Sequence, residues 1–486
     1  VGYQFSKSDV THLNFQYDNN DAPETLDRRI TDYQNSSPLL KSQFEDIEND
    51  SDFWEFGGDY EHTFANGSRW RNLFIINQKE DDRLRERFNI EETKEKDLFL
   101  KTRNKYKEEI FRTSYSMNLA RNQDLELGVE RAKTTLDSKL RLGLLVGEAP
   151  SADFGGLTPI SRSNATVQEI RYEGFAVHNW QINDQMSLES TLIYEESTIE
   201  QAGDTSKKRG FSFVRPKIDY RFDITPSLQF RATVEKDVAQ LSFNDFTANI
   251  APNNDDDKNT FAGNPEIRQE QSWRYDLNLE YRFNDDNGVI NTNLFYQDLE
   301  DLIDRIDVST AETIQSANGN IGNGKRYGGS IDTSYRLASF NLPQLLITAR
   351  VDLTESAAND PFLNIQRPIQ RQGKGNYRYG FRYDLGSRNI SYGLSFRGSL
   401  DGDQIVYDID KVEDYYYDDF IMGFLEIQGW GGLIYLFQVT NPHESYRCRI
   451  RTRYEYGTIA TGSLSEIEDS CSHSGEKYAI KVRGTF

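Results

Sequence analysis

The stretch Trp273-Arg274-Tyr275-Asp276-Leu277-Asn278-Leu279-Glu280-Tyr281-Arg282-Phe283 decides the fold class of this chain. Every odd-numbered position is aromatic or Leu, and every even-numbered position is charged or Asn. Successive side chains of a β-strand point to opposite faces of the sheet. The stretch therefore predicts a strand with one apolar face and one charged face.

The same alternation returns in many other segments. It is found at residues 218–224, 228–235, 326–337, 377–385 and 390–397. Alternation over such lengths indicates half-apolar strands. We predict an all-β fold, a transmembrane antiparallel β-barrel in which the apolar faces contact the lipid bilayer and the charged faces line the lumen. A soluble all-β binding protein remains the alternative.

The composition fits a membrane barrel better than a helical membrane protein. The chain has 486 residues, of which 36% are hydrophobic and 28% are charged. No run reaches the roughly 20 apolar residues of a membrane helix. The net charge of −22 argues against nucleic-acid binding, because a surface that contacts phosphates needs an excess of Lys and Arg.

Short turns and long polar segments alternate along the chain. Nine short turns are rich in Asn, Asp, Gly, Ser and Pro, as at residues 65–68, 183–185 and 225–227. Long polar segments lie between them, as at residues 18–51, 79–95, 241–268, 401–414 and 457–474. This asymmetry is typical of outer-membrane barrels. Nine hairpins and a last strand predict about 19 strands in one domain, residues 1–486. Bacterial barrels have even strand numbers and the large transporters have 22, so we expect 22 strands in the full protein.

The C-terminal residues resemble the signal by which outer-membrane barrels are recognised for insertion. Tyr478, Ile480 and Val482 alternate with polar or small residues, and the chain ends on Phe486. An ordinary final strand with a Phe is the alternative. Together with the strand pattern, the sequence favours the insertion signal, with the barrel-assembly machinery as a partner.

Three consecutive segments resemble the barrel of TonB-dependent outer-membrane receptors. The first contains Gly263-Asn264-Pro265-Glu266 and runs on through Trp273 to Phe283. The second is residues 293–303 and the third is residues 323–331, in the family's order and spacing. The resemblance implies a 22-strand barrel, a plug domain in the lumen and uptake energised by TonB. No plug-like segment is found in this chain, so the plug and the first strands are expected upstream of Val1.

Cys448 and Cys471 are the only cysteines, and they bracket the last long polar segment. Two cysteines that close a short loop predict a disulfide in an oxidising compartment, and two free thiols are the less favoured alternative. A disulfide at this spacing would stabilise the fold by roughly 3 kcal/mol through the entropy of the unfolded chain.

Other candidate sites carry weaker signals. The acidic run of residues 253–257 is interpreted as a solvated loop in preference to a cation site. Tyr415, Tyr416 and Tyr417 are typical of an aromatic girdle at the membrane interface, with a ligand-stacking surface as the alternative. The five histidines are dispersed and lack metal-ligand spacing. We predict no catalytic residue, no cofactor and no metal site.

The sequence therefore predicts a receptor in the outer membrane of a Gram-negative bacterium. It is expected to import a scarce nutrient, such as a metal chelate, an oligosaccharide or a peptide, by plug movement and without chemistry. The expected partners are lipid and lipopolysaccharide, the TonB complex acting through a plug, and an unidentified ligand. A barrel of this type that anchors or secretes a partner without transport is the second alternative.

Overall fold

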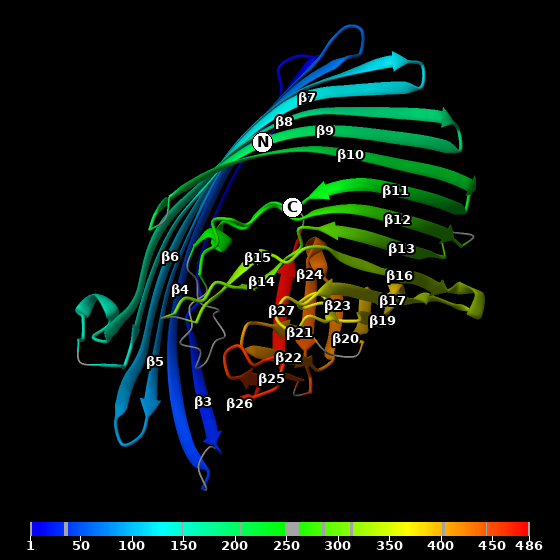
Figure 1. Ribbon diagram of the computed structural model, residues 1–486. Helices are drawn as coiled ribbons and strands as arrows, with labels where there is room; N and C mark the ends of the chain where they lie inside the picture. The colour runs from blue at the N-terminus through cyan, green and yellow to red at the C-terminus, as the bar shows by residue number, and fades with distance from the viewer. Residues whose placement is uncertain are drawn as a thin grey trace. The chain divides into compact units, whose positions relative to one another are not determined.

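The structure is a computed structural model of the chain, shown in Figure 1. It describes residues 2–33, 37–147, 149–204, 206–247, 262–283, 287–311, 314–400, 404–443 and 445–484. The acidic run at residues 253–257 and the terminal Phe486 lie outside the described residues. The predictions that fall on them are therefore not tested.

The chain forms two compact units. Unit 1 consists of Val1–Asn179, Thr191–Arg215 and Leu241–Ile267. Unit 2 consists of Trp180–Ser190, Pro216–Gln240 and Arg268–Phe486. Strands β8, β9 and β10 each contribute residues to both units.

Unit 1 is built from long antiparallel strands. They are β1 (Gly2–Gln4), β2 (Asp9–Asp21), β3 (Glu24–Asp32), β4 (Leu39–Thr63), β5 (Arg69–Ile90), β6 (Lys94–Ala120) and β7 (Gln123–Leu144), with parts of β8 (Thr158–Asn183), β9 (Met186–Gly203) and β10 (Lys207–Thr225). Two short 3-10 helices, η1 (Ala152–Phe154) and η2 (Phe243–Phe246), complete the unit. Strand β4 pairs with β2, β3 and β5, and β6 pairs with β5 and β7.

The long strands correct one expectation from the sequence. Strand β4 has 25 residues and β6 has 27, whereas crossing a membrane takes about 9–11 residues of a strand. The polar segments at residues 18–51 and 79–95, expected to be loops, contain much of β3, β4 and β5. Charged and polar residues interrupt the apolar alternation in these segments, so the sequence pattern does not show that the strands continue.

Unit 2 contains the remaining strands. Its antiparallel ladder consists of the last part of β10 followed by β11 (Leu228–Val238), β12 (Gln271–Arg282), β13 (Gly288–Glu300), β16 (Gly324–Leu337), β17 (Leu342–Asn359), β19 (Gly375–Leu385), β20 (Ile390–Ser399), β23 (Phe420–Gln428), β24 (Ile434–Thr440) and β27 (Lys477–Arg483). Three 3-10 turns, η4 (Ala338–Phe340), η5 (Gly386–Arg388) and η6 (Trp430–Gly432), connect ladder strands.

Seven further strands of unit 2 lie in the long connections. They are β14 (Ile303–Asp307), β15 (Ser316–Asn320), β18 (Gln366–Arg367), β21 (Gln404–Tyr407), β22 (Lys411–Tyr417), β25 (Ser445–Tyr454) and β26 (Leu464–Ser474). Strand β18 has two residues and pairs with the end of β17. Strands β21, β22, β25 and β26 form a separate four-stranded sheet, called the loop sheet below. The remaining strands of the described chain, with β3 also set aside as a connection, agree with the predicted count of about 19.

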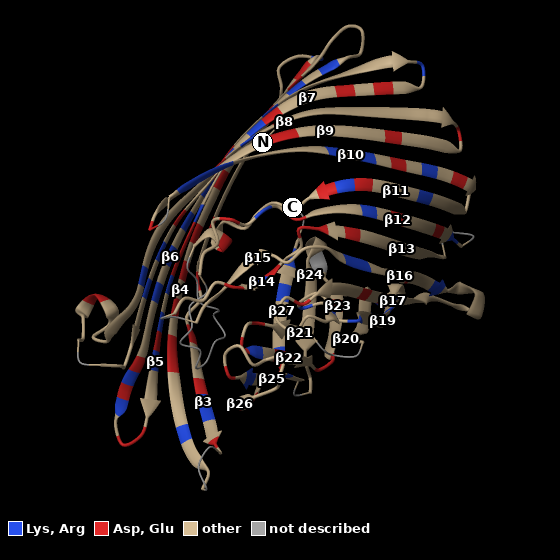
Figure 2. Cartoon of the chain, viewed as in Figure 1, with Lys and Arg blue, Asp and Glu red and all other residues tan. Residues whose placement is uncertain are grey.

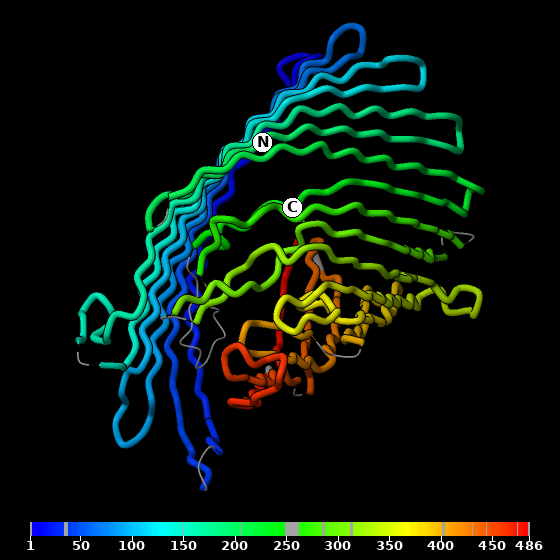
Figure 3. Tube along the Cα trace, viewed as in Figure 1, coloured from blue at the N-terminus to red at the C-terminus, as the bar shows by residue number. Residues whose placement is uncertain are grey.

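The predicted alternation in β12 is confirmed. Tyr275, Leu277, Leu279 and Tyr281 are each between 41% and 48% exposed on one face. A soluble core would bury these side chains, because large exposed apolar surfaces are rare in soluble monomers. Figure 2 shows basic and acidic residues following one another along the strands, and Figure 3 traces the same strands as a tube.

The predicted short turns join neighbouring strands. Residues 65–68 connect β4 to β5, residues 183–185 connect β8 to β9, and residues 225–227 connect β10 to β11. Asn341 and Asn389, each at the end of a 3-10 turn, adopt positive φ angles of 60° and 56°. Asn tolerates this left-handed conformation better than most residues, which explains its frequency in these turns.

The predicted C-terminal strand is β27, which pairs with β24. Tyr478, Ile480 and Val482 are exposed by 74%, 70% and 57% of their surface. Among the described residues, no helix is long and apolar enough to cross a membrane.

Candidate functional site

The Gly263-Asn264-Pro265-Glu266 motif forms a tight packed turn in unit 1. A Cβ atom on Gly263 would lie 2.3 Å from the carbonyl oxygen of Phe246, so only glycine fits there. The backbone N–H of Asn264 donates to the carbonyl of Asp245 at 2.7 Å. The Asn264 side-chain oxygen accepts the backbone N–H of Glu266 at 2.9 Å.

The same turn is fastened to strand β10. Arg209 donates to the carbonyl oxygens of Ile267 at 2.7 Å and of Pro265 at 3.2 Å, and Lys207 forms an ion pair with Glu266. These contacts satisfy the backbone groups of a segment outside the strands. The motif therefore has a structural role in this chain.

The other two residues of the family-like stretch lie on β12 or next to it. Trp273 pairs in register with Lys236 and Asp298. Phe283 follows the strand, and its ring centroid is 4.8 Å from that of Tyr335. Both belong to the wall of strands and contact no cavity described below.

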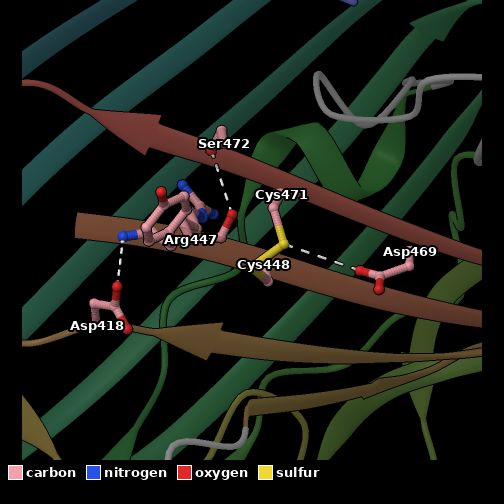
Figure 4. Close-up of a disulfide and its surroundings, with 7 residues drawn as sticks. Asp418, Arg447, Cys448, Asp469, Cys471 and Ser472 are labelled. Carbon is pink, nitrogen blue, oxygen red and sulfur yellow. Dashed lines mark hydrogen bonds between the residues drawn. A yellow bond between two sulfur atoms is a disulfide. The ribbon is translucent and has the colours of Figure 1, made fainter. Parts of the chain in front are cut away.

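Cys448 and Cys471 form a disulfide with an S–S distance of 2.08 Å, as the sequence predicts. The two residues lie directly opposite each other on β25 and β26. Figure 4 shows the bridge and, beside it, the Ser472 hydroxyl that donates to the carbonyl of Arg447 at 3.4 Å. The disulfide therefore joins two strands of the loop sheet and limits their separation.

One face of the loop sheet carries a row of arginines. Arg447, Arg449, Arg451 and Arg453 alternate along β25. Arg451 is 1% exposed, and it donates to Glu413 at 2.7 Å and to Glu468 at 3.0 Å. Buried arginines need such carboxylate partners because an unpaired buried charge is costly.

Tyr415 belongs to this buried face. Its hydroxyl donates to Glu413 at 2.9 Å. Burial, together with the neighbouring Glu413 carboxylate, raises the pKa of Tyr415 to about 12. The three tyrosines at positions 415–417 thus lie in the loop sheet, and neither the girdle nor the ligand-stacking interpretation is tested by this placement alone.

Long connections of unit 2 are tied together by Arg367. Its guanidinium binds Asp360 at 2.5 Å and Asp304 at 2.9 Å, and lies 4.4 Å from the ring centroid of Tyr407. Burial raises the pKa of the Asp304 carboxyl, and Arg367 opposes this effect. The connections that contain β14, β18 and β21 are therefore fixed to one another.

A polar cavity of about 640 Å³ lies in unit 2, beside the middle of β17, the first residues of β19 and the last residues of β20. Its volume is within the usual range for small-molecule sites. The side chains of interest in its lining are Arg350, Arg378, Arg397, Tyr417, Asp418 and Phe420. We take this cavity as the candidate binding site.

Strand register brings three of these arginines into one row. Arg350 on β17 lies opposite Arg378 on β19, and Arg378 lies opposite Arg397 on β20. The three residues are far apart in the sequence, so no sequence motif predicts the row. Only the register of the three strands reveals it.

Unit 1 has an apolar groove of about 610 Å³ across strands β5 to β9. Trp70, Leu127, Val129, Leu192 and Tyr194 line it, and each is at least 43% exposed. Because these residues belong to the exposed apolar face, the groove is part of the outer surface of the strands and not a polar binding site.

Of the candidate residues that the sequence singled out, Tyr417 lines the polar cavity. Gly263 to Glu266, Trp273, Phe283, the two cysteines and the residues of β27 all lie elsewhere. The described residues contain no group of three or more His, Cys, Asp or Glu side chains that could hold a metal ion.

Alternating strands, an exposed apolar face and a charged opposite face define an outer-membrane β-barrel protein. A family model described as "TonB dependent receptor-like, beta-barrel" matches residues 2–416. The chain therefore belongs to the family of TonB-dependent receptor barrels, which are outer-membrane proteins of Gram-negative bacteria.

Solved structures show the same fold at low sequence identity. The alcaligin outer-membrane receptor FauA from Bordetella pertussis is 12% identical, with a TM-score of 0.54 over 93% of this chain and 72% of FauA. The ferripyoverdine receptor of Pseudomonas aeruginosa is 11% identical, with a TM-score of 0.61 over 99% of this chain and 68% of the receptor. The ferric citrate transporter FecA is 11% identical, with a TM-score of 0.58 over 98% of this chain and 76% of FecA.

No curated protein sequence matches the chain at a significant level. The family and the structural neighbours are receptors and transporters and not enzymes.

Proposed function

We propose that residues 1–486 are the barrel domain of a receptor that imports a scarce nutrient across the outer membrane. The family match over residues 2–416 carries the proposal. The apolar strand faces, on which Tyr275 and Leu277 are 43% and 48% exposed, would contact lipid and lipopolysaccharide. The charged faces would line the lumen.

Import by this family needs a plug domain and energy from TonB, and we infer both for the full protein. The neighbours named above are, by their names, an alcaligin receptor, a ferripyoverdine receptor and a ferric citrate transporter. A metal chelate is therefore the first ligand class to test, before an oligosaccharide or a peptide. The polar cavity at Arg350, Arg378 and Arg397 is the proposed place of capture.

An uptake assay in the source bacterium tests the proposal. Cells that lack the protein would be compared with wild-type cells and with cells that lack TonB, using radiolabelled iron or copper supplied with defined chelators. The expected result is one chelate whose uptake falls to the same background in both deletion strains. Equal uptake of every chelate by all three strains would contradict the import function.

A further inference from the structure

We propose that the polar cavity of unit 2 binds a small multivalent anion through the guanidinium groups of Arg378 and Arg397, which have no carboxylate partner among the described residues. This inference rests on the proposed function, because it names the chemical class of the ligand at the proposed place of capture. The recognised groups are carboxylates or phosphates, and a negatively charged metal chelate belongs to this class.

The first observation is the row of like charges. Arg350, Arg378 and Arg397 stand directly opposite one another on adjacent strands. Like charges in directly opposite positions destabilise a sheet. An anion bound beside the row would reduce this repulsion.

The second observation is where the carboxylates are. Arg350 is compensated, because it binds Asp352 at 2.7 Å and lies 3.6 Å from Asp332. Among the described residues, no carboxylate lies within 4.0 Å of the guanidinium groups of Arg378 or Arg397. Both side chains are exposed. They are therefore available to a ligand.

On one side of the arginine row, the neighbouring residues carry no negative charge. Thr348, Gly380 and Ser395 form the next cross-strand row on the same face, and all three are neutral and small. Such residues leave room for a ligand that approaches the arginines from that side.

The wall contributed by β22 and β23 adds aromatic and cationic groups. The Arg397 guanidinium lies 3.9 Å from the ring centroid of Phe420, and that of Arg447 lies 5.2 Å from the ring centroid of Tyr417. Asp418 also lines the cavity, but its carboxylate accepts the backbone N–H of Tyr446 at 2.8 Å. Stacking on an aromatic ring holds a guanidinium in place and keeps its N–H groups available.

The geometry of the guanidinium selects the ligand chemistry. Its fork of N–H donors matches the paired oxygens of carboxylate and phosphate groups and forms two parallel charged hydrogen bonds with each. Two adjacent forks in a cavity of about 640 Å³ therefore fit a small molecule with at least two such groups. A neutral sugar would leave both charges uncompensated.

Isothermal titration calorimetry on the full-length protein in detergent micelles tests the inference. Citrate and pyrophosphate are the two anionic probes, trehalose is the neutral probe, and the ionic strength is held constant. We expect citrate or pyrophosphate to bind and trehalose not to bind. The probe that binds more tightly distinguishes a carboxylate ligand from a phosphate ligand.

The double variant Arg378→Gln/Arg397→Gln is expected to weaken binding of the preferred anion about ten-fold or more, since each lost charged hydrogen bond matters on that scale. Arg274→Gln is the matched control, because Arg274 lies on the charged face of β12 and is already paired with Asp276 at 2.6 Å. That control is expected to bind as the wild type does. Heat-modifiable mobility in gels verifies that each variant is folded.

Two outcomes would overturn the inference: wild-type protein that binds neither anion better than trehalose, or a folded double variant with wild-type affinity. The test is separate from that of import. Anion binding without TonB-dependent uptake would contradict the import function and support the anion site. Uptake without anion binding would contradict the anion site alone.

Discussion

Charged side chains of the strands are arranged differently in the two units. In unit 1, Arg215 lies 2.8 Å from Glu173 and 3.1 Å from Glu195, and Arg171 lies 3.1 Å from Glu173. In unit 2, Arg378 and Arg397 face each other without a carboxylate partner among the described residues. The first arrangement is a closed ion-pair network that supports the wall. The second leaves charge for a ligand.

Each unit also contains a buried ion cluster, and the two clusters differ in the sign of the central charge. In unit 1, the carboxylate of Glu45 is held between Arg85 and Arg28, each at 2.8 Å. In unit 2, the guanidinium of Arg367 is held between two aspartates. Both clusters are internally compensated, so they are structural, and the open row at the cavity differs from both.

The largest expected effect is that of Arg367→Ala. The change would leave Asp304 and Asp360 buried without their cation, and removing one partner of a buried ion pair costs about 3–5 kcal/mol. We expect hydrogen exchange in β14 and β18 to accelerate accordingly. Arg388→Ala, in an exposed short turn, is the control and should leave exchange unchanged. Equal exchange in both variants would show that Arg367 does not hold these connections.

Alkaline pH should weaken the loop sheet through Tyr415. Its pKa is raised from 10.0 to about 12 in the folded protein, so its stabilising contribution is complete below pH 10 and is lost as the pH rises through 12. The loss amounts to at most about 3 kcal/mol. Hydrogen exchange of β22 measured against pH is expected to show this dependence in the wild type.

The variant Tyr415→Phe cannot ionise at position 415 and is expected to flatten the pH dependence between 10 and 12. A variant with the same pH dependence as the wild type would assign it to another group.

Glu173→Ala tests the closed network of unit 1. The change removes a shared partner of Arg171 and Arg215, and we expect the free energy of unfolding in urea to fall by about 2 kcal/mol. Glu189→Ala on β9 is the control, because Glu189 has no ion pair among the described residues. A similar decrease in the free energy of unfolding in both variants would mean that the ion-pair network does not stabilise unit 1.

The smallest effect is expected for Arg378→Gln. Relief of like-charge repulsion should leave the free energy of unfolding unchanged or raise it by up to about 1 kcal/mol. Urea unfolding without added anion provides the measurement. A clear loss of stability would show that Arg378 has a structural partner and would make unit 2 resemble unit 1.

The sequence predicts the strands of the main sheet well, because apolar and polar residues alternate wherever one face of a strand is apolar. The alternating stretch at residues 273–283 predicts the boundaries of β12 (Gln271–Arg282) to within two residues. The short turn predicted at residues 183–185 separates β8 from β9. The disulfide followed from Cys448 and Cys471 being the only cysteines. The long extensions of β4 and β5 were missed because charged and polar residues interrupt the apolar alternation there.

The sequence indicated Tyr417 as a possible ligand-stacking residue, but the arginines of the candidate site were missed for a different reason. Arg350, Arg378 and Arg397 each look like one more charged residue in an alternating strand. Their meaning depends on register across β17, β19 and β20, and a shift of one residue would turn any of them to the other face. Conversely, Gly263 and Asn264 stood out in the sequence and form a structural turn.

The most direct test of the account is to locate a bound anion. Crystals of the full-length protein soaked in sodium selenate would be measured at the selenium absorption edge. The account predicts an anomalous difference peak between the guanidinium groups of Arg378 and Arg397 and none at the closed network around Glu173. Peaks at other arginines with none at Arg378 and Arg397 would contradict it.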